Sequence, residues 1–123
     1  MSLQHALVAA RAAASKTSEE TVVLDVGELI GITDYFVIAS GRNDRQVRAI
    51  VDEVTRKVRE VRGVPPRQVE GLQAAEWVLV DYGDFVVHVF NPEARQYYAL
   101  ERLWSFAPRV SWEADLASPG ARV

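Results

Sequence analysis

The chain has 123 residues, of which 49% are hydrophobic, so it is long enough for one domain with a buried core and too short for two. It contains no cysteine, which excludes disulfides, thiol catalysis and thiolate metal ligands and fits a cytoplasmic location. The formal net charge of −3 disfavours a protein whose main task is to bind phosphate backbones, and no apolar run is long enough to span a bilayer.

The first part of the chain predicts a helix followed by two strands. Leucine and alanine recur at helical spacing from Leu3 to Ala14, and with few serines and a single arginine this segment favours a helix over a transit peptide. Residues 21–26 and 34–39 are nearly continuous apolar runs, rich in β-branched and aromatic residues. Because neither run alternates with polar residues, we expect both strands to lie centrally with both faces covered.

The clearest predicted element is a helix that begins after Asn43. The Asn43 side chain is expected to cap it, with Gln46 reaching back as in a capping box. Gly63 ends the helix, and a stiff proline pair follows. The predicted buried stripe consists of Val47, Ile50, Val51, Val54, Val58 and Val61.

A β-hairpin is predicted over residues 77–90, after a short edge strand near residues 68–71. The hairpin signal is a β-rich apolar run that meets Gly83 and resumes at once. If Tyr82 and Gly83 form a two-residue loop, the register follows by counting outward. One face then carries valines and a phenylalanine and belongs to the core.

The other face of this hairpin is unusual. In the predicted register Asp81 lies opposite Asp84, and Trp77 lies opposite His88. Two carboxylates side by side cost roughly 0.2–1 kcal/mol if nothing relieves their repulsion. We therefore expect a basic group or water near this end of the hairpin.

A last helix is predicted to begin at Pro92, because Asn91 is a suitable N-cap and proline suits the first helical position. It carries the apolar side chains of Tyr97, Leu100, Leu103 and Trp104. The order α-β-β-α-β-β-β-α predicts an α/β (α+β) domain, with a mixed sheet of about five strands flanked by helices.

No regular pattern continues after the last helix. We assign residues 1–106 to one domain and residues 107–123 to a C-terminal tail that is partly disordered. Within this tail, Trp112 is expected to fold back onto the domain, whereas residues 117–123 are expected to be mobile.

The sequence carries no motif for catalysis, metal or cofactor binding. The patterns GxxxxGK[ST], GxGxxG and G-x-S-x-G are absent. His5 and His88 have no partner at a metal-ligand spacing. Asp81 and Asp84 bracket a turn, whereas a strand pair for nucleotidyl transfer would be spaced i,i+2. We therefore predict no enzyme, no metal and no cofactor.

Binding fits the residues better than catalysis does. Trp77 and His88 offer an aromatic patch, and the carboxylates near it would select a partner rich in Lys and Arg. Alternatively, a helix of the same chain covers this face and Trp77 belongs to the core. The residues alone leave both readings open. In the arginine-rich segment 45–62, acidic residues interleave with the basic ones, which favours a solvated helix face over an RNA-binding one.

Several motifs in colinear order, spanning residues 3–106, resemble the ribosomal silencing factor RsfS or Iojap family. The matching segments are Ile32–Gly41, Arg45–Val47, Glu70–Gly71, Trp77–Asp84, Val87–Phe90 and Arg95–Trp104. The resemblance implies a mixed sheet flanked by helices, related to nucleotidyltransferases but without their catalytic carboxylates. It also implies a cytoplasmic, non-enzymatic repressor of translation that often forms homodimers off the ribosome.

The resemblance further implies a partner and a binding surface. Family members bind the large ribosomal subunit through ribosomal protein L fourteen and thereby block joining of the small subunit. Neither a membrane nor a specific nucleic-acid sequence is implied as a partner. Carried over by position, the partner-binding residues are Trp77, Asp81, Asp84 and His88, with Glu70, Arg95 and Tyr98 as further candidates. The alternative function is a nucleotide-binding or nucleotidyltransferase-like enzyme on the same architecture.

Overall fold

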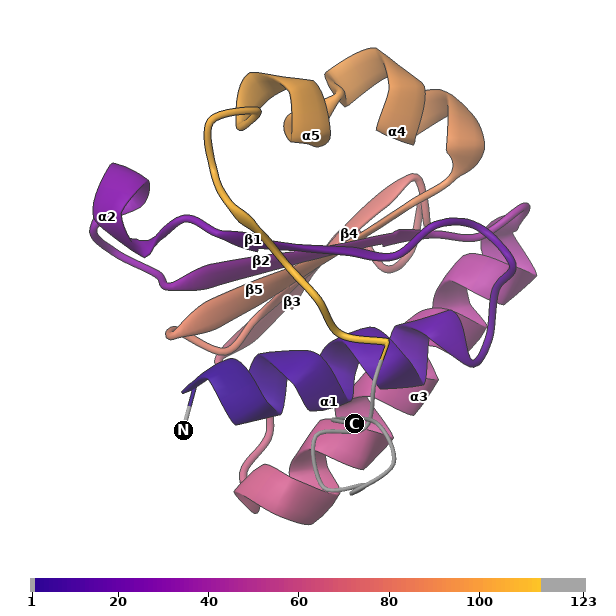
Figure 1. The fold of residues 1–123 in the computed structure, drawn as a ribbon. Helices are drawn as coiled ribbons and strands as arrows, with labels where there is room; N and C mark the ends of the chain where they lie inside the picture. The colour runs from indigo at the N-terminus through magenta and orange to yellow at the C-terminus, as the bar shows by residue number, and fades with distance from the viewer. Residues whose placement is uncertain (1, 114–123) are drawn as a thin grey trace.

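The computed structural model describes residues 2–113, which form a six-stranded sheet with helices on both faces (Figure 1). The helices are α1 (Ser2–Ala14), α2 (Gly27–Ile30), α3 (Asp44–Arg62), α4 (Pro92–Tyr98) and α5 (Leu100–Leu103). The strands are β1 (Val22–Asp25), β2 (Tyr35–Ser40), β3 (Gln68–Glu70), β4 (Trp77–Asp81), β5 (Phe85–Phe90) and β6 (Arg109–Val110). The predicted mixed sheet and element order are confirmed, with α2, β6 and a divided last helix as additions.

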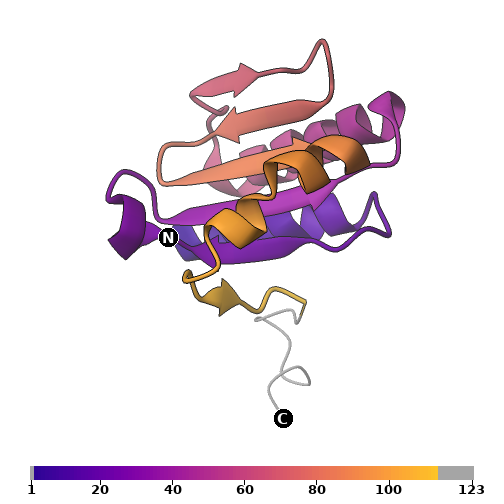
Figure 2. The same cartoon turned by 90° about the horizontal axis from the view of Figure 1, so that it is seen from above.

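The strands lie in the order β3-β4-β5-β2-β1-β6 (Figure 2). The β2–β5 pair is parallel, and all other neighbouring pairs are antiparallel. Both early strands, β1 and β2, have a neighbour on each side, as their continuous apolar runs predict. In β2, Val37, Ile38 and Ala39 are fully buried, because helices cover both faces of the sheet.

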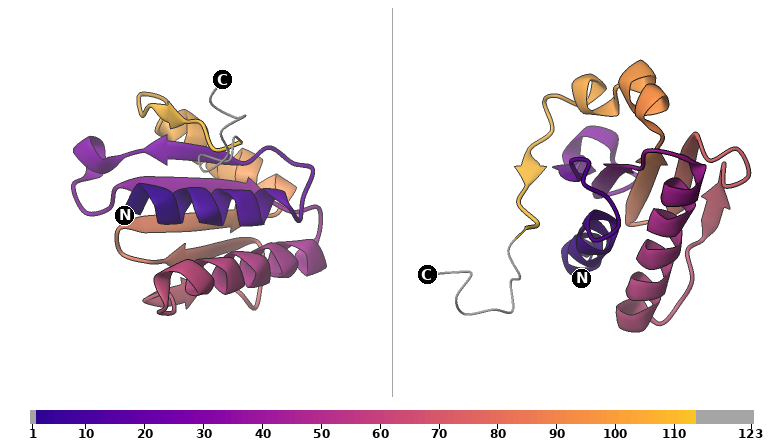
Figure 3. Two further views of the ribbon diagram at one scale, coloured as in Figure 1. Left: turned by 60° about the horizontal axis from the view of Figure 1, so that its bottom comes forward. Right: turned by 90° about the vertical axis from the view of Figure 1, so that its right-hand side faces the viewer.

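Helices α1 and α3 lie side by side on one face of the sheet (Figure 3). The alanines of α1 leave room for α3 to approach closely, and the predicted valine and isoleucine stripe of α3 is buried. Val61 is the exception, since it is exposed. The stripe continues from Val58 by four residues to Arg62 rather than by three to Val61, so Arg62 takes the inward position.

The opposite face is covered by α4 and α5, which are two short helices where the sequence predicts one. The chain breaks at Ala99, which adopts φ 49° and ψ 50°. This left-handed conformation costs an alanine roughly 1–2 kcal/mol, which burial of Leu100 against the sheet offsets. Of the apolar side chains on this predicted helix, Tyr97 and Leu103 are exposed and Leu100 is buried.

The β4–β5 turn is also displaced from its predicted position. Its loop consists of Gly83 and Asp84, and the Tyr82 N–H donates to the Phe85 carbonyl oxygen at 3.0 Å. The rings of Tyr82 and Phe85 stack in the core with centroids 4.7 Å apart. Burial of Tyr82 explains the shift, since a loop position would leave its ring in water. Gly83 adopts φ 92°, which glycine tolerates in a tight hairpin turn.

The shifted turn changes the pairing but not the faces. The observed pairs are Trp77–Phe90, Val78–Val89, Leu79–His88, Val80–Val87 and Asp81–Val86. The predicted opposition of Trp77 and His88 is therefore wrong, and so is that of Asp81 and Asp84. Because side chains alternate along a strand, a register change of two residues leaves each of them on its own face. The division into a core face and a mixed face is confirmed.

Residues 107–113, called the strap below, run from α5 alongside β1 to α1 (Figure 1). They contain β6, which is too short to leave a periodic pattern in the sequence. Trp112 folds back as predicted and packs against the core. The tail predicted to be mobile, residues 117–123, lies outside the described residues, and the domain end at residue 106 stays a prediction. Between residues 2 and 113, no helix has the length and apolar character needed to cross a membrane.

Candidate interaction surface

The mixed face of the hairpin is organised around Trp77 and His88. They sit diagonally across the β4–β5 pair, and the Trp77 Nε1–H donates to His88 Nδ1 at 3.1 Å. Trp77 is half-buried, whereas His88 is only 4% exposed. The sequence therefore places both residues on the correct face, but only Trp77 of this pair has substantial surface available to a partner.

His88 is an uncharged, buried histidine. Because the Trp77 indole donates to Nδ1, the ring proton of the neutral imidazole lies on Nε2. Nε2 is buried and has no hydrogen-bond partner among residues 2–113, while the Phe36 ring packs edge-on at 4.6 Å. Burial in these surroundings lowers the pKa of His88 to about 4. This side chain supports Trp77 from beneath.

Tyr98 of α4 contacts Trp77 from the other side. Their ring centroids lie 4.5 Å apart, and Tyr98 is 47% exposed. Below this pair, Glu70, Gly71, Trp77 and Leu79 line an open groove of about 300 Å³. Glu70 pairs with Leu79 across β3 and β4, which places its carboxylate at the rim of the groove. We call Glu70, Trp77, Leu79 and Tyr98 the Trp77 face.

The backbone at Gly71 shapes one side of this groove. Gly71 adopts φ +85°, and a Cβ atom built there would lie 2.2 Å from the Trp77 carbonyl oxygen. The loop that follows is held by Arg48 of α3, whose guanidinium donates to the carbonyl oxygens of Leu72 and Gln73 at 3.3 and 2.6 Å. The β3–β4 connection is thus fixed against α3 and positions Trp77.

The two aspartates at the hairpin end have partners in their own chain. Asp84 forms a bidentate pair with Arg62 of α3, at 2.7 and 3.1 Å. Asp81 accepts the Gly83 N–H at 2.7 Å. A basic group does lie at this end of the hairpin, as the sequence predicts. This basic group is the inward-facing Arg62, whose guanidinium also packs over the rings of Tyr82 and Phe85.

Replacing Arg62 with alanine is expected to lower the free energy of unfolding by about 2 kcal/mol, because Asp84 would lose its partner in a partly buried site. The side chains of Arg62 and Asp84 are 20% and 28% exposed, so the loss is smaller than for a fully buried pair. Urea unfolding measures the change. Arg59→Ala removes an exposed arginine from the same helix end and serves as the control; an equal loss in both variants would contradict this role for Arg62.

Arg95 lies away from the Trp77 face. Its guanidinium donates to both Glu101 carboxylate oxygens at 2.9 and 3.1 Å, to the Glu20 carbonyl oxygen at 2.6 Å and to the Ser40 hydroxyl at 2.9 Å. The structure therefore brings Glu70, Trp77, His88 and Tyr98 together and places Asp81, Asp84 and Arg95 elsewhere.

The partner-binding residues predicted from the sequence do not include Leu79 and Gly71, which line the groove. Alternation along β4 places Leu79 beside Trp77, so that signal was available. The close approach of Gly71 to Trp77 left no signal, because it depends on the path of a loop.

Among residues 2–113, no three histidine or acidic side chains gather as a metal site. An aromatic groove with a carboxylate rim is suited to binding a partner with apolar and cationic side chains.

Comparisons with known proteins agree with this picture. The family model "Ribosomal silencing factor during starvation" matches residues 1–122. Ribosomal silencing factor RsfS of Halalkalibacterium halodurans is 42% identical over 110 residues, which cover 89% of this chain and 93% of that protein. RsfS of Bacillus subtilis is 44% identical over 101 residues, covering 82% and 85%. A crystal structure of a Chromobacterium violaceum protein is similar with a TM-score of 0.80 at 33% identity, covering 98% of both chains.

Proposed function

Because the chain belongs to the ribosomal silencing factor family, we propose that it binds ribosomal protein L fourteen on the large subunit and blocks subunit joining. The family consists of non-enzymatic regulators that bind the ribosome. Repression by steric exclusion needs no reaction, only occupancy of the surface where the small subunit docks. The proposed setting is the cytoplasm, where free subunits meet.

The observation that supports this proposal best is the Trp77 face. Its centre is an aromatic pair beside an open groove, and its rim carries the exposed carboxylate of Glu70. Glu76, which precedes Trp77 in the chain, and Glu93 of α4 are also exposed. Neither forms an ion pair with another residue of the described range. The Glu70 carboxylate accepts a bond from Gln68 but pairs with no cation of the described residues. An aromatic pair beside such an exposed carboxylate is complementary to a basic protein surface.

We assign different roles to the residues expected at the interface. Direct contact is proposed for Glu70, Trp77 and Tyr98, which are exposed or half-buried on one face. His88 is proposed to hold the Trp77 ring, and Asp84 to fix the hairpin through Arg62. When the protein is not bound to the ribosome, we propose that it forms a homodimer that covers this face.

Re-association of separated ribosomal subunits tests the function. Added protein is expected to keep the subunits apart in a sucrose gradient and to sediment with the large one. Trp77→Ala and Tyr98→Ala are each expected to weaken this binding roughly 30-fold, as for a residue at an interface hot spot. Leu29→Ala, which truncates an exposed apolar side chain on α2, at the other end of the strands, is the control and should bind normally.

Urea unfolding of each variant separates loss of contact from loss of fold. Normal re-association of subunits at saturating protein would rule out the proposed function. If Trp77→Ala unfolds while Tyr98→Ala binds normally, Trp77 is a core residue and the proposed face is wrong.

A further inference from the structure

The α4–α5 layer has little packing of its own to hold its orientation. Its buried side chains are Ala94 and Leu100, the half-buried Trp104 packs edge-on against Phe36, and the chain breaks between the two helices at Ala99. Tyr98, which contacts Trp77, is the last residue before this break. Small rotations of such short helices would separate the two rings, so polar contacts outside the core contribute to fixing the layer.

Arg95 joins the two helices across the break. It lies in α4, and both of its bonds to Glu101 reach into α5. The same guanidinium contacts the Glu20 carbonyl oxygen, just before β1, and the Ser40 hydroxyl at the end of β2. One side chain thereby fixes the angle between α4 and α5 and ties both to the sheet.

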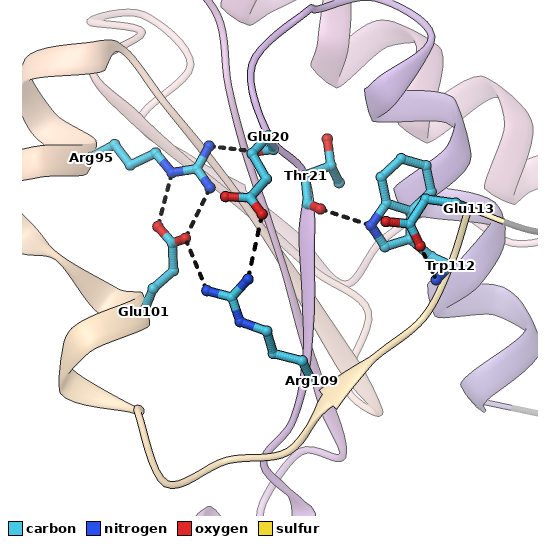
Figure 4. Close-up of polar contacts among 7 residues, drawn as sticks. All are labelled: Glu20, Thr21, Arg95, Glu101, Arg109, Trp112 and Glu113. Atoms are coloured by element: carbon cyan, nitrogen blue, oxygen red, sulfur yellow. Dashed lines mark hydrogen bonds and ion pairs between the residues drawn. The ribbon is translucent and has the colours of Figure 1, made fainter.

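The strap continues this network to the sheet edge (Figure 4). Arg109 lies between the carboxylates of Glu20 and Glu101, at 3.4 and 3.9 Å. Farther along the strap, the Trp112 indole N–H donates to the Thr21 carbonyl oxygen at 2.7 Å. The Trp112 carbonyl oxygen accepts a bond from Arg11 of α1 at 3.3 Å. The strap thus connects α5, the edge of β1 and the helix on the opposite face.

We propose that Arg95 and Trp112 are positioning residues for the Trp77 face: they hold the α4–α5 layer where Tyr98 packs on Trp77, without contacting the partner. The part of this inference that concerns partner binding rests on the proposed function. Arg95 is then not an interface residue, although the family resemblance suggests it as one.

Burial separates these two residues from their neighbours in the network. The side chains of Arg95 and Glu101 are 15% and 23% exposed, whereas those of Arg109 and Glu20 are 59% and 67% exposed. Exposed ion pairs contribute little because water and salt screen them. Trp112, in contrast, combines ring packing against the core with a partly buried hydrogen bond. Arg95 and Trp112 are therefore the anchors, and Arg109 only adds to them.

The chain offers a matched control for Arg95. Arg95 and Arg102 both line an open cavity of about 580 Å³. Unlike Arg95, the Arg102 side chain makes no hydrogen bond or ion pair with another residue of the described range. Arg95→Gln and Arg102→Gln change the charge of this layer equally. A difference between them reports the network and not the charge.

Hydrogen exchange and large-subunit binding of the full-length variants test the proposal. In Arg95→Gln, backbone amides of residues 92–106 are expected to exchange about tenfold faster, while those of β2 and β5 remain unchanged. Binding to isolated large subunits is expected to weaken about tenfold, since the competent arrangement becomes less populated. Arg102→Gln should change neither. Trp112→Phe, which keeps a ring but loses the bond to Thr21, should accelerate the same amides to a smaller extent.

The outcomes separate this proposal from the proposed function. Weaker binding of Arg95→Gln with unchanged exchange would make Arg95 a direct contact and overturn the inference. Equal exchange in Arg95→Gln and Arg102→Gln would also overturn it. If the unaltered protein does not bind large subunits, the proposed function fails, and the exchange experiment still decides whether Arg95 and Trp112 hold the layer. If Arg95→Gln unfolds, Trp112→Phe provides that decision.

Discussion

Gly71→Ala is expected to lower the free energy of unfolding by about 3 kcal/mol and to abolish binding to the large subunit. A Cβ atom at this position would lie 2.2 Å from the Trp77 carbonyl oxygen, so the backbone of the loop or of β4 must move. Either movement displaces Trp77, whose backbone also pairs with β5. The variant therefore acts on stability and on the Trp77 face together.

Two other glycines separate the clash from conformational strain. Gly63 and Gly31 adopt φ +82° and +83°, close to the value of Gly71, but an added Cβ would meet no atom within 4 Å at either position. Gly63→Ala and Gly31→Ala should therefore cost only about 1 kcal/mol each, from the left-handed backbone. Urea unfolding and subunit sedimentation give the comparison. Similar losses for all three variants would contradict the proposed clash.

The stability of the protein is expected to fall by up to about 3 kcal/mol as the pH decreases from 6.5 to 4, because of His88. Burial lowers the pKa of His88 to about 4, below its value of 6.5 in the unfolded chain. Between these values the unfolded state binds a proton that the folded state does not, so acidification favours unfolding. Protonation of Nδ1 would also remove the acceptor of the Trp77 indole bond.

His88→Gln isolates this contribution from the titration of carboxylates. Glutamine offers an oxygen to the Trp77 indole and does not titrate, so the difference in unfolding free energy between the two proteins should grow as pH rises from 4 to 6.5 and then level off. Urea unfolding at a series of pH values measures it. A constant difference across this range would show that His88 does not titrate in the predicted way.

The sequence was sufficient for features that depend on local pattern. Asn43 caps α3 by accepting the Gln46 N–H at 2.9 Å, and Asn91 caps α4 in the same way, because a cap involves only residues in one turn. Trp77 and His88 were assigned to one face of the hairpin because alternation along a strand survives a shift of register. Much of the sheet and the centre of the candidate face could be predicted for this reason.

Tertiary packing decided the features that depend on distant partners. Tyr82 extends the hairpin by one pair because its ring is buried beside Phe85. The free energy gained by this burial depends on the folded core, so the local sequence does not reveal it. The break at Ala99 likewise follows from the fit of Leu100 to the sheet.

The same reason separates the two halves of the candidate site. Alternation within one strand brought Trp77 and Leu79 to the groove, so the sequence alone determined that half. The contact of Tyr98 with Trp77, the pairing of Arg62 with Asp84 and the network of Arg95 join elements far apart in the chain. Burial and charge pairing between such elements are properties of the folded molecule, and only the tertiary structure could decide them.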